Sequence, residues 1–263
     1  MNLVQNFLTQ NPCYKANRKI KVKGLMIHSV GCSQPKAEVF LKNWNRSTYT
    51  NACVHAFIDG NTGTVYQTLP WDHRAWHGGG SSNNTHIGVE MCEPSTIKYT
   101  GGASFTDLNP AATKKTVLRT YEAAVELFAY LCKEFDLDPM LDIVSHAEGN
   151  ALGIATPHGD PEHLWKFYGL SMDGFRTAVK GAMGKVTSNP TKTEKPVSGA
   201  QGTSYKVKIT ASALNIRSGA GTNYPVVGVI RDQGVYTIIE EKGSWGRLKS
   251  KVGWIHLGYT NKL

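Results

Sequence analysis

The hydrophobic pattern of residues 1–184 contains several short apolar runs. Each run is short enough for one strand, and continuous runs are typical of strands that are covered on both faces. They occupy residues 21–29, 53–59, 64–69, 86–92 and 142–146. The second and third runs flank Gly-Asn-Thr-Gly, which predicts a hairpin.

Two other stretches have the spacing of helices. Residues 109–135 place apolar side chains on one face, with Asn109 as a cap and Pro110 in the first turn. Residues 171–183 predict a closing helix. Strands that alternate with helices predict an α/β domain with a mixed central sheet flanked by helices.

The end of the chain has a different pattern. Residues 204–263 are short β-runs broken by glycine turns, which suits a small all-β barrel. Residues 185–203 are rich in Thr, Ser, Pro and Gly and predict a flexible linker. We therefore expect a domain over 1–184, a linker over 185–203 and a second domain over 204–263.

Composition narrows the class of protein. No stretch approaches 18 consecutive apolar residues, so we expect no transmembrane helix and no membrane insertion. The N-terminus has no basic start followed by an apolar core, so no secretory signal peptide is expected. The five cysteines are an odd number without CxxC spacing, which predicts a protein that is made in reduced form in a cytoplasm.

The net charge of +9 is concentrated at the end of the chain. Residues 204–263 hold nine Lys and Arg against three acids, whereas 1–184 hold seventeen against sixteen. A basic tail can attract phosphate-rich polymers, either nucleic acid or wall teichoic acid, or can simply keep a small domain soluble. We expect no nucleic acid, because the tail lacks a basic helix and paired zinc ligands.

Three separated segments each carry a candidate zinc ligand. His28 and His146 end apolar runs, and Asp160 lies in a loop with His158. Zinc binds imidazole nitrogen and carboxylate oxygen at about 2.0–2.2 Å, and a catalytic site leaves one position to water. Alone, each histidine also fits a hydrogen-bonded core residue. Together the three residues predict a Zn²⁺ site, and no HExxH helix is present as another source of metal ligands.

Glu90 interrupts the otherwise apolar run Ile87–Met91. An unpaired buried carboxylate is costly, so it indicates a partner or a catalytic role. The alternative is that Glu90 points outward on an alternating strand. We expect a general base that acts on a water molecule. The residue types alone predict a zinc hydrolase that acts on an amide or an ester.

Three stretches resemble the zinc-dependent N-acetylmuramoyl-L-alanine amidases of the peptidoglycan-recognition-protein-like (amidase type 2) family. They are MIHSVG (26–31), the stretch from VHAFIDG to VEMCE (54–93), and SHAEGNALGIATPHGDPEHLW (145–165). The resemblance covers roughly residues 20 to 180. It implies hydrolysis of the amide bond between N-acetylmuramate and L-alanine in peptidoglycan.

The same resemblance implies roles for the candidate residues. His28, His146 and Asp160 match the family's metal ligands, and Glu90 matches the branch of the family that has Glu rather than Tyr beside the zinc-activated water. His158 matches a position that stabilises the developing oxyanion and often holds Lys. Because histidine titrates near neutral pH, we expect activity to fall more at alkaline pH than in a relative with Lys.

Further polar residues are candidates for substrate binding. His77 stands next to a glycine run, His55 lies on a strand, and Asn83 and Asn84 lie in a Ser/Asn/Gly-rich loop. We expect the other histidines of this domain at the surface or as capping residues. They are His73, His86 and His163.

The tail resembles bacterial SH3 (SH3b) domains in ALNIRSGAGTNYPVVGVI and GSWGRLKSKVGWIHLGY. This implies binding to cell-wall peptide or glycan, with bacterial peptidoglycan as the partner and teichoic acid as a second candidate. Four aromatic residues can offer contact surface or belong to the core. They are Tyr205, Trp245, Trp254 and Tyr259.

The amidase-like part looks most similar to the family members of phages and prophages of Gram-positive bacteria, and the two resemblances together imply a modular lysin of the endolysin type. Such a monomer would be made in the host cytoplasm and reach the wall by a holin-type route or on lysis. Two alternatives stay open: a zinc peptidase that cuts the stem peptide, and a peptidoglycan-binding protein without catalysis.

Overall fold

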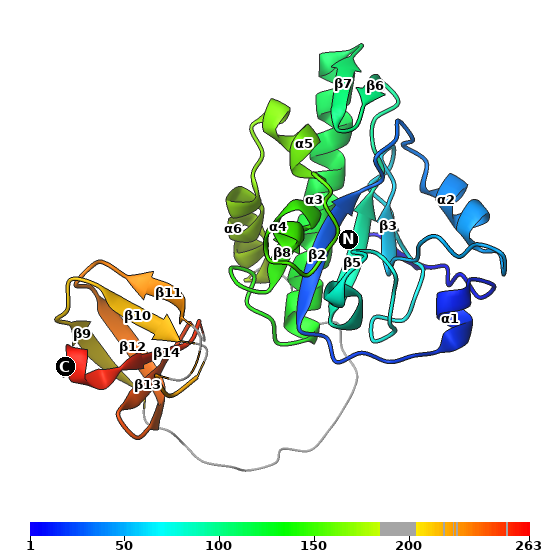
Figure 1. Cartoon of the computed structure of the whole chain (residues 1–263). Coiled ribbons are helices and arrows are strands. Elements are labelled where there is room, and N and C mark those ends of the chain that lie inside the picture. The colour runs from blue at the N-terminus through cyan, green and yellow to red at the C-terminus, as the bar shows by residue number, and fades with distance from the viewer. Residues whose placement is uncertain (185–203, 218, 223, 225, 251) are drawn as a thin grey trace. The chain divides into compact units, whose positions relative to one another are not determined.

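The computed structural model describes residues 1–184, 204–217, 219–222, 224, 226–250 and 252–263. The linker predicted over 185–203 lies outside the described residues. The chain divides into two compact units, Met1–Thr187 and Ser188–Leu263, and each is described by itself (Figure 1).

The first unit contains a mixed six-stranded sheet in the order β1-β4-β3-β5-β2-β8. The strands are β1 (Leu3–Gln5), β2 (Gly24–Ser29), β3 (Ala56–Ile58), β4 (Val65–Gln67), β5 (His86–Met91) and β8 (Ile143–Ser145). Only β3 and β4 pair antiparallel, as the predicted hairpin, and the other neighbours in this sheet are parallel. The predicted α/β class with a mixed sheet is confirmed.

Helices cover both faces of this sheet. They are α1 (Pro12–Ala16), α2 (Ala37–Trp44), α3 (Pro110–Glu134), α4 (His146–Ala151), α5 (Glu162–Trp165) and α6 (Met172–Met183), with 3-10 turns η1 (Ser81–Asn84) and η2 (Lys166–Tyr168). Asn109 caps α3 by accepting the N–H of Ala112, and Pro110 opens its first turn, as predicted. Among the described residues, no helix is long and apolar enough to cross a membrane.

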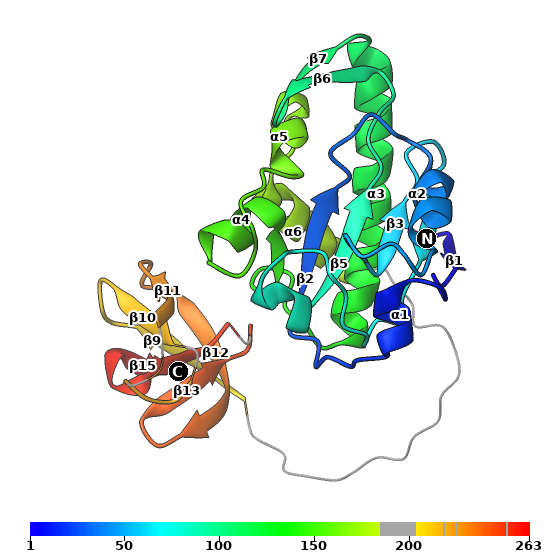
Figure 2. The ribbon, with the colours of Figure 1, turned by 45° about the vertical axis from the view of Figure 1, so that its right-hand side comes forward.

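The alternation of side chains along the central strands decides where the site lies. Leu25 and Ile27 of β2 and Val89 of β5 pack in the main core with α3 and α6, which Figure 2 shows behind these strands. Successive side chains of a strand point to opposite faces, so His28 and Glu90 face away from α3. The sheet therefore presents these two polar side chains on the face that α3 leaves open.

A small hairpin stands apart from the main sheet. It consists of β6 (Ile97–Gly101) and β7 (Ser104–Asp107) and lies next to α5 (Figure 2). The Tyr168 hydroxyl donates to Asp107 at 2.5 Å, and the Phe105 and Phe167 rings meet at 5.1 Å between centroids. These contacts hold the hairpin against the segment that follows Asp160.

The second unit is all-β, as predicted. Its antiparallel sheet has the order β11-β10-β14-β13-β12-β9-β15. The elements are β9 (Tyr205–Ile209), β10 (Leu214–Arg217), β11 (Val226–Ile230), β12 (Val235–Lys242), β13 (Trp245–Leu248), β14 (Trp254–His256), η3 (Leu257–Tyr259) and β15 (Thr260–Lys262). Its apolar cluster includes Val207 and Ile238, which are almost fully buried.

Candidate functional site

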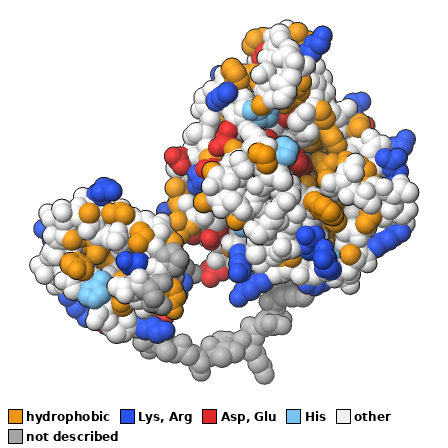
Figure 3. All heavy atoms as spheres, viewed as in Figure 1, with side chains coloured by type: hydrophobic (Ala, Val, Ile, Leu, Met, Phe, Trp, Pro, Cys, Tyr) orange, Lys and Arg blue, Asp and Glu red, His pale blue; other side chains and the backbone are white. Residues whose placement is uncertain are grey.

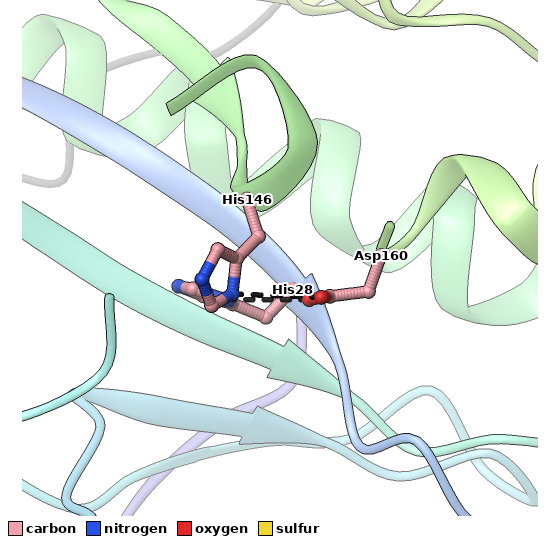
Figure 4. A group of neighbouring side chains, drawn as sticks. All are labelled: His28, His146 and Asp160. Atoms are coloured by element: carbon pink, nitrogen blue, oxygen red, sulfur yellow. Dashed lines mark hydrogen bonds and ion pairs between the residues drawn. The ribbon is translucent and has the colours of Figure 1, made fainter. Parts of the chain in front are cut away.

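His28, His146 and Asp160 come together at one end of the central strands (Figure 4). The two Nδ1 atoms of the histidines lie 3.0 Å apart. The carboxylate of Asp160 reaches both rings, at 3.3 Å from His28 Nδ1 and 3.4 Å from His146 Nδ1. One potential ligand atom from each residue lies within 4.8 Å of the others.

The parallel pairing of β2 with β8 places the two histidines side by side. Ile27 of β2 is the register partner of Ser145 of β8, so the residues that follow them, His28 and His146, are neighbours. Ser145 then starts α4 with a capping box, because its hydroxyl accepts the N–H of Glu148 while the Glu148 side chain accepts the N–H of Ser145. His146 therefore leaves the strand as the first residue of a helix.

The hydrogen-bond partners of His77 assign the proton of His28. His77 Nε2 lies 3.1 Å from the carbonyl of His86, which only accepts, so His77 carries its proton on Nε2. His77 Nδ1 is then an acceptor for His28 Nε2 at 2.9 Å. His28 consequently presents the lone pair of Nδ1 toward His146 and Asp160.

A second chain of hydrogen bonds assigns the proton of His146. The Thr156 hydroxyl donates to the carbonyl of Gly78 at 3.2 Å, so its oxygen can accept from His146 Nε2 at 3.3 Å. His146 then also presents the lone pair of Nδ1. This arrangement resembles the outer partners that fix the tautomer of metal-binding histidines.

The charges of these groups agree with a cation site. Burial lowers the pKa of His28 and, more strongly, that of His77, which keeps both rings neutral. Burial opposes ionisation of Asp160, but the neighbouring side chains of His146 and His28 outweigh this effect and lower the pKa of the carboxyl. Two neutral imidazole lone pairs and a carboxylate that converge on one point fit Zn²⁺, which favours nitrogen and oxygen ligands.

Glu90 lies beside the triad on the neighbouring strand. It is the register partner of His28 in the parallel pair β2–β5, so both side chains lie on the same face of the sheet. Its Oε2 atom is buried and has no hydrogen-bond partner within the described part of the chain. Burial, and then the negative charges of Asp160 and Glu93, raise its pKa well above the ordinary value. Such a carboxyl is suited to exchanging a proton near neutral pH.

These groups open onto a cavity of about 660 Å³, a size that suits a drug-sized or peptide-sized ligand. Its lining is largely polar and also includes Trp76, which has 51% of its surface exposed. Figure 3 shows histidine, acidic and apolar side chains close together on this part of the first unit. Among the residues that line the cavity are Ser29, Trp76, His77, Glu90, Tyr99, His146, Thr156, His158, Asp160 and His163.

His158 belongs to the exposed part of the cavity wall. Its ring centroid lies 4.6 Å from that of His146, and its Nδ1 lies 3.1 Å from the Thr156 hydroxyl. Because Nδ1 is occupied in this way, Nε2 is the nitrogen that a bound molecule can reach. The structure therefore brings His158 to the same cavity as the triad and Glu90.

The residues expected to bind substrate lie in three different places. His77 lines the cavity but also holds His28, as described above. His55 does not line the cavity: it is fully buried, its Nε2 donates to the His73 carbonyl, its Nδ1 accepts from Gly88, and burial lowers its pKa to about 4. His55 is thus a core residue that joins backbone segments.

Asn84 also lies outside the cavity lining, where its side chain accepts from Arg74 at 2.6 Å. Its neighbour Asn83 is the residue that serves the site. The Asn83 side chain accepts the N–H groups of His77 and Gly78 at 2.8 and 2.9 Å, and so fixes the turn that carries His77.

Sequence reasoning missed a buried network at the cavity wall. Glu93 accepts hydrogen bonds from the Ser29 hydroxyl at 2.7 Å, the Gly31 N–H at 3.2 Å and the Tyr99 hydroxyl at 2.7 Å. His163 Nε2 lies 2.6 Å from the same Tyr99 hydroxyl. The expectation of a surface or capping role for His163 is wrong, because α5 packs it against the hairpin with 8% exposure.

Comparison with known proteins gives two family matches. The family model described as N-acetylmuramoyl-L-alanine amidase matches residues 18–163, and the bacterial SH3 domain model matches residues 212–261. A bifunctional autolysin of Staphylococcus epidermidis is 27% identical over 201 residues, which cover 72% of this chain. The match spans only 14% of the length of that relative.

Two solved structures are similar to this chain. The Staphylococcus aureus hydrolase AmiA, solved in complex with its ligand, is 20% identical with a TM-score of 0.52, over 70% of this chain and 83% of that chain. A mutant endolysin from Bacillus subtilis is also 20% identical, with a TM-score of 0.47 over 68% of this chain and 99% of that chain.

Proposed function

The chain belongs to the N-acetylmuramoyl-L-alanine amidase family, whose model matches more than half of its residues, and we propose that it is a zinc-dependent amidase of bacterial peptidoglycan. The bond cleaved is the amide between N-acetylmuramate and L-alanine. One observation carries the proposal: the lone pairs of His28 and His146 and the carboxylate of Asp160 converge in the same cavity as the unpartnered Oε2 of Glu90.

The metal ligands in this proposal are His28, His146 and Asp160. When bound there, Zn²⁺ supplies Lewis acidity that polarises a carbonyl and lowers the pKa of a water molecule. His77 and Thr156 keep the two imidazoles in the tautomers that leave Nδ1 free.

Glu90 is the proton carrier. Its carboxylate accepts a proton from the attacking water, and because its pKa is raised it holds that proton until the amide nitrogen departs. It then donates the proton to the amino group of L-alanine. The lack of a hydrogen-bond partner for Oε2 within the described residues leaves that atom available for both transfers.

His158 stabilises the negative charge that develops on the carbonyl oxygen. The imidazolium form of histidine carries a proton on both nitrogens, so Nε2–H can donate into the cavity while Nδ1–H donates to the Thr156 hydroxyl. Histidine stands here where many members of the family have lysine.

The second unit supports an action on intact cell walls. It matches the bacterial SH3 domain model, and the staphylococcal relative carries the name autolysin. We infer that this unit holds the enzyme on peptidoglycan. A phage-type origin, release by a holin-type route and a monomeric state stay predictions.

The test is digestion of N-acetylmuramoyl-L-alanyl-D-isoglutamine and of purified Gram-positive peptidoglycan, with new amino termini labelled and identified. The proposal expects new N-terminal L-alanine, its loss with a chelator and its return with zinc. Glu90→Gln is the matched variant, because it keeps the three metal ligands and removes the proton carrier. New termini elsewhere in the stem peptide would show a peptidase instead. Binding to the wall without release of termini would show a recognition protein.

A further inference from the structure

The second unit has a pocket of its own, with a volume of about 420 Å³. Three aromatic rings form one side of it. The Trp245 and His256 rings meet edge to face with centroids 5.2 Å apart, and the His256 and Tyr259 centroids lie 5.6 Å apart. Tyr259 is 54% exposed, and Trp245 and His256 are half-buried, so aromatic surface faces solvent at this pocket. Figure 3 shows apolar, histidine and basic side chains together on one face of this unit.

The backbone explains why the rings stand together. Trp245 and His256 are register partners in the antiparallel pair β13–β14, which places their side chains next to each other. The His256 side chain then accepts the N–H of Gly258 and so starts the turn η3, which ends at Tyr259. The pocket is therefore built on paired strands and one capped turn.

Arg217 supplies the positive charge of the pocket. Its Nη1 donates to the backbone carbonyls of Thr222 and Tyr224 at 3.0 and 2.8 Å. These neutral partners hold the guanidinium in position but do not cancel its charge. Arginine presents its donors as a planar fork, which leaves further N–H groups for an anion.

No acidic side chain balances Arg217 in the described part of this unit. Its three acids have other partners, since Asp232 accepts from Tyr236, Glu240 pairs with Arg247, and Glu241 accepts from Tyr205. None of the three acids lines the pocket. The unit also carries a strong excess of basic residues, which attracts anions from a distance.

The combination of an arginine fork with partly exposed rings indicates the class of ligand. A carboxylate or a phosphate can pair with the fork in two parallel hydrogen bonds. A polymer of phosphate and small polyols would use the charge but would leave the apolar rings of Trp245 and Tyr259 without a partner. A short peptide that ends in a carboxylate and carries small apolar side chains uses both parts of the pocket.

We propose that this pocket binds a short peptide through a free carboxylate at Arg217 and small apolar side chains on the rings of Trp245, His256 and Tyr259. The stem peptide of peptidoglycan has this chemistry, and its identification as the natural ligand rests on the proposed function. Binding at this site would keep the chain on the peptides while the first unit cuts them from the glycan.

The test is a titration of the full-length, ¹⁵N-labelled chain followed by nuclear magnetic resonance. The indole N–H signal of Trp245 is the reporter, assigned by its loss in Trp245→Phe. The probes are N-acetyl-alanyl-alanine, the same dipeptide with an amidated C-terminus, and glycerol 3-phosphate. We expect the free acid to shift the Trp245 signal and to bind about tenfold more tightly than the amide, since a charge-assisted pair is lost. Equal binding of acid and amide, a stronger response to glycerol 3-phosphate, or no response to any probe would overturn the proposal.

Three variants separate the parts of the pocket. Tyr259→Ala removes an exposed ring and should weaken binding of the free acid about tenfold. Arg217→Lys keeps the charge but loses the paired N–H donors of the guanidinium, and it should reduce the difference in affinity between the free acid and the amide. Val235→Ala is the control, because Val235 is similarly exposed on β12 but does not line the pocket. Weakening by Val235→Ala equal to that by Tyr259→Ala would contradict the assignment.

Cleavage of N-acetylmuramoyl-L-alanyl-D-isoglutamine should be unchanged in all three variants, because this small substrate needs only the first unit. The two proposals can therefore fail separately. Absence of peptide binding with normal cleavage would contradict only the proposal that the pocket of the second unit binds a peptide. Absence of cleavage with normal peptide binding contradicts the proposed amidase alone.

Discussion

Replacing His77 with alanine should weaken zinc binding although His77 is not one of the proposed ligands. The change removes the acceptor of His28 Nε2–H, which lies 2.9 Å from His77 Nδ1. His28 is buried, so its N–H then lacks a partner. The neutral ring can move its proton to Nδ1, where it meets Asp160 at 3.3 Å and blocks the lone pair that the metal needs.

The size of the effect follows from these contacts. A buried donor that loses its partner costs about 1–3 kcal/mol. Loss of an outer partner of a metal-binding histidine typically lowers metal affinity about 10–100-fold. At about 1.36 kcal/mol for each factor of ten, this range corresponds to roughly 1.4–2.7 kcal/mol of binding free energy. The two figures agree, so we expect a loss of about this size.

The assay is competition for Zn²⁺ between the full-length chain and a chromophoric chelator at neutral pH. His86→Gln is the matched control, because only the backbone carbonyl of His86 accepts from His77 Nε2, and that carbonyl is retained. Circular dichroism of each variant checks that the fold is intact. A zinc affinity of His77→Ala within twofold of the unmodified chain would refute the assignment of protons in this relay.

Four further predictions concern single side chains. Glu90→Gln should lower hydrolysis about 10²–10⁴-fold without loss of zinc binding, measured by release of L-alanyl peptides. Burial raises the pKa of Glu90, so the folded chain binds more protons than the unfolded chain, and the contribution of Glu90 to stability falls as pH rises through the raised pKa. In urea unfolding with a chelator present, Glu90→Gln should therefore be more stable than the unmodified chain at pH 8. Below pH 4, Glu90→Gln should not be more stable. His158→Lys should extend activity to higher pH in a pH–rate profile, since lysine keeps its charge there, and identical profiles would contradict the role of His158. Tyr99→Phe removes hydrogen bonds to Glu93 and His163 and should lower the free energy of unfolding in urea by about 1–3 kcal/mol. Tyr130→Phe is the control and should lower it less, because the Tyr130 hydroxyl has no hydrogen bond in the described part of the chain.

The fold was largely predictable because its signals are local. The apolar runs around Ile27 and Val89 mark central strands, and Asn109 followed by Pro110 marks the start of the long helix. The candidate ligands could also be named from sequence, since two histidines end apolar runs, an aspartate follows in a loop, and these segments resemble the amidase family. Their convergence depends on the parallel pairing of β2 with β8, which no single segment reveals.

The rest of the site depends on contacts between distant segments. The role of His77 becomes visible only when its turn is placed against His28, 49 positions away. Nothing in the local sequence distinguishes His163 from other helix residues. Its role depends on the hairpin, which places Tyr99, 64 positions away, in contact with it. In the same way, alternation along a strand could not show that both nitrogens of His55 are taken by backbone groups.

The pairing of His28 with Glu90 across β2 and β5 has a consequence for changing this protein by design. Neighbouring strands lie about 4.8 Å apart, so the backbone sets the spacing between the proposed ligand and the proposed proton carrier. Loops around the cavity can then be lengthened or exchanged to accept other wall peptides without altering that spacing. A one-residue slip of either strand would instead turn one of the two side chains into the core against α3.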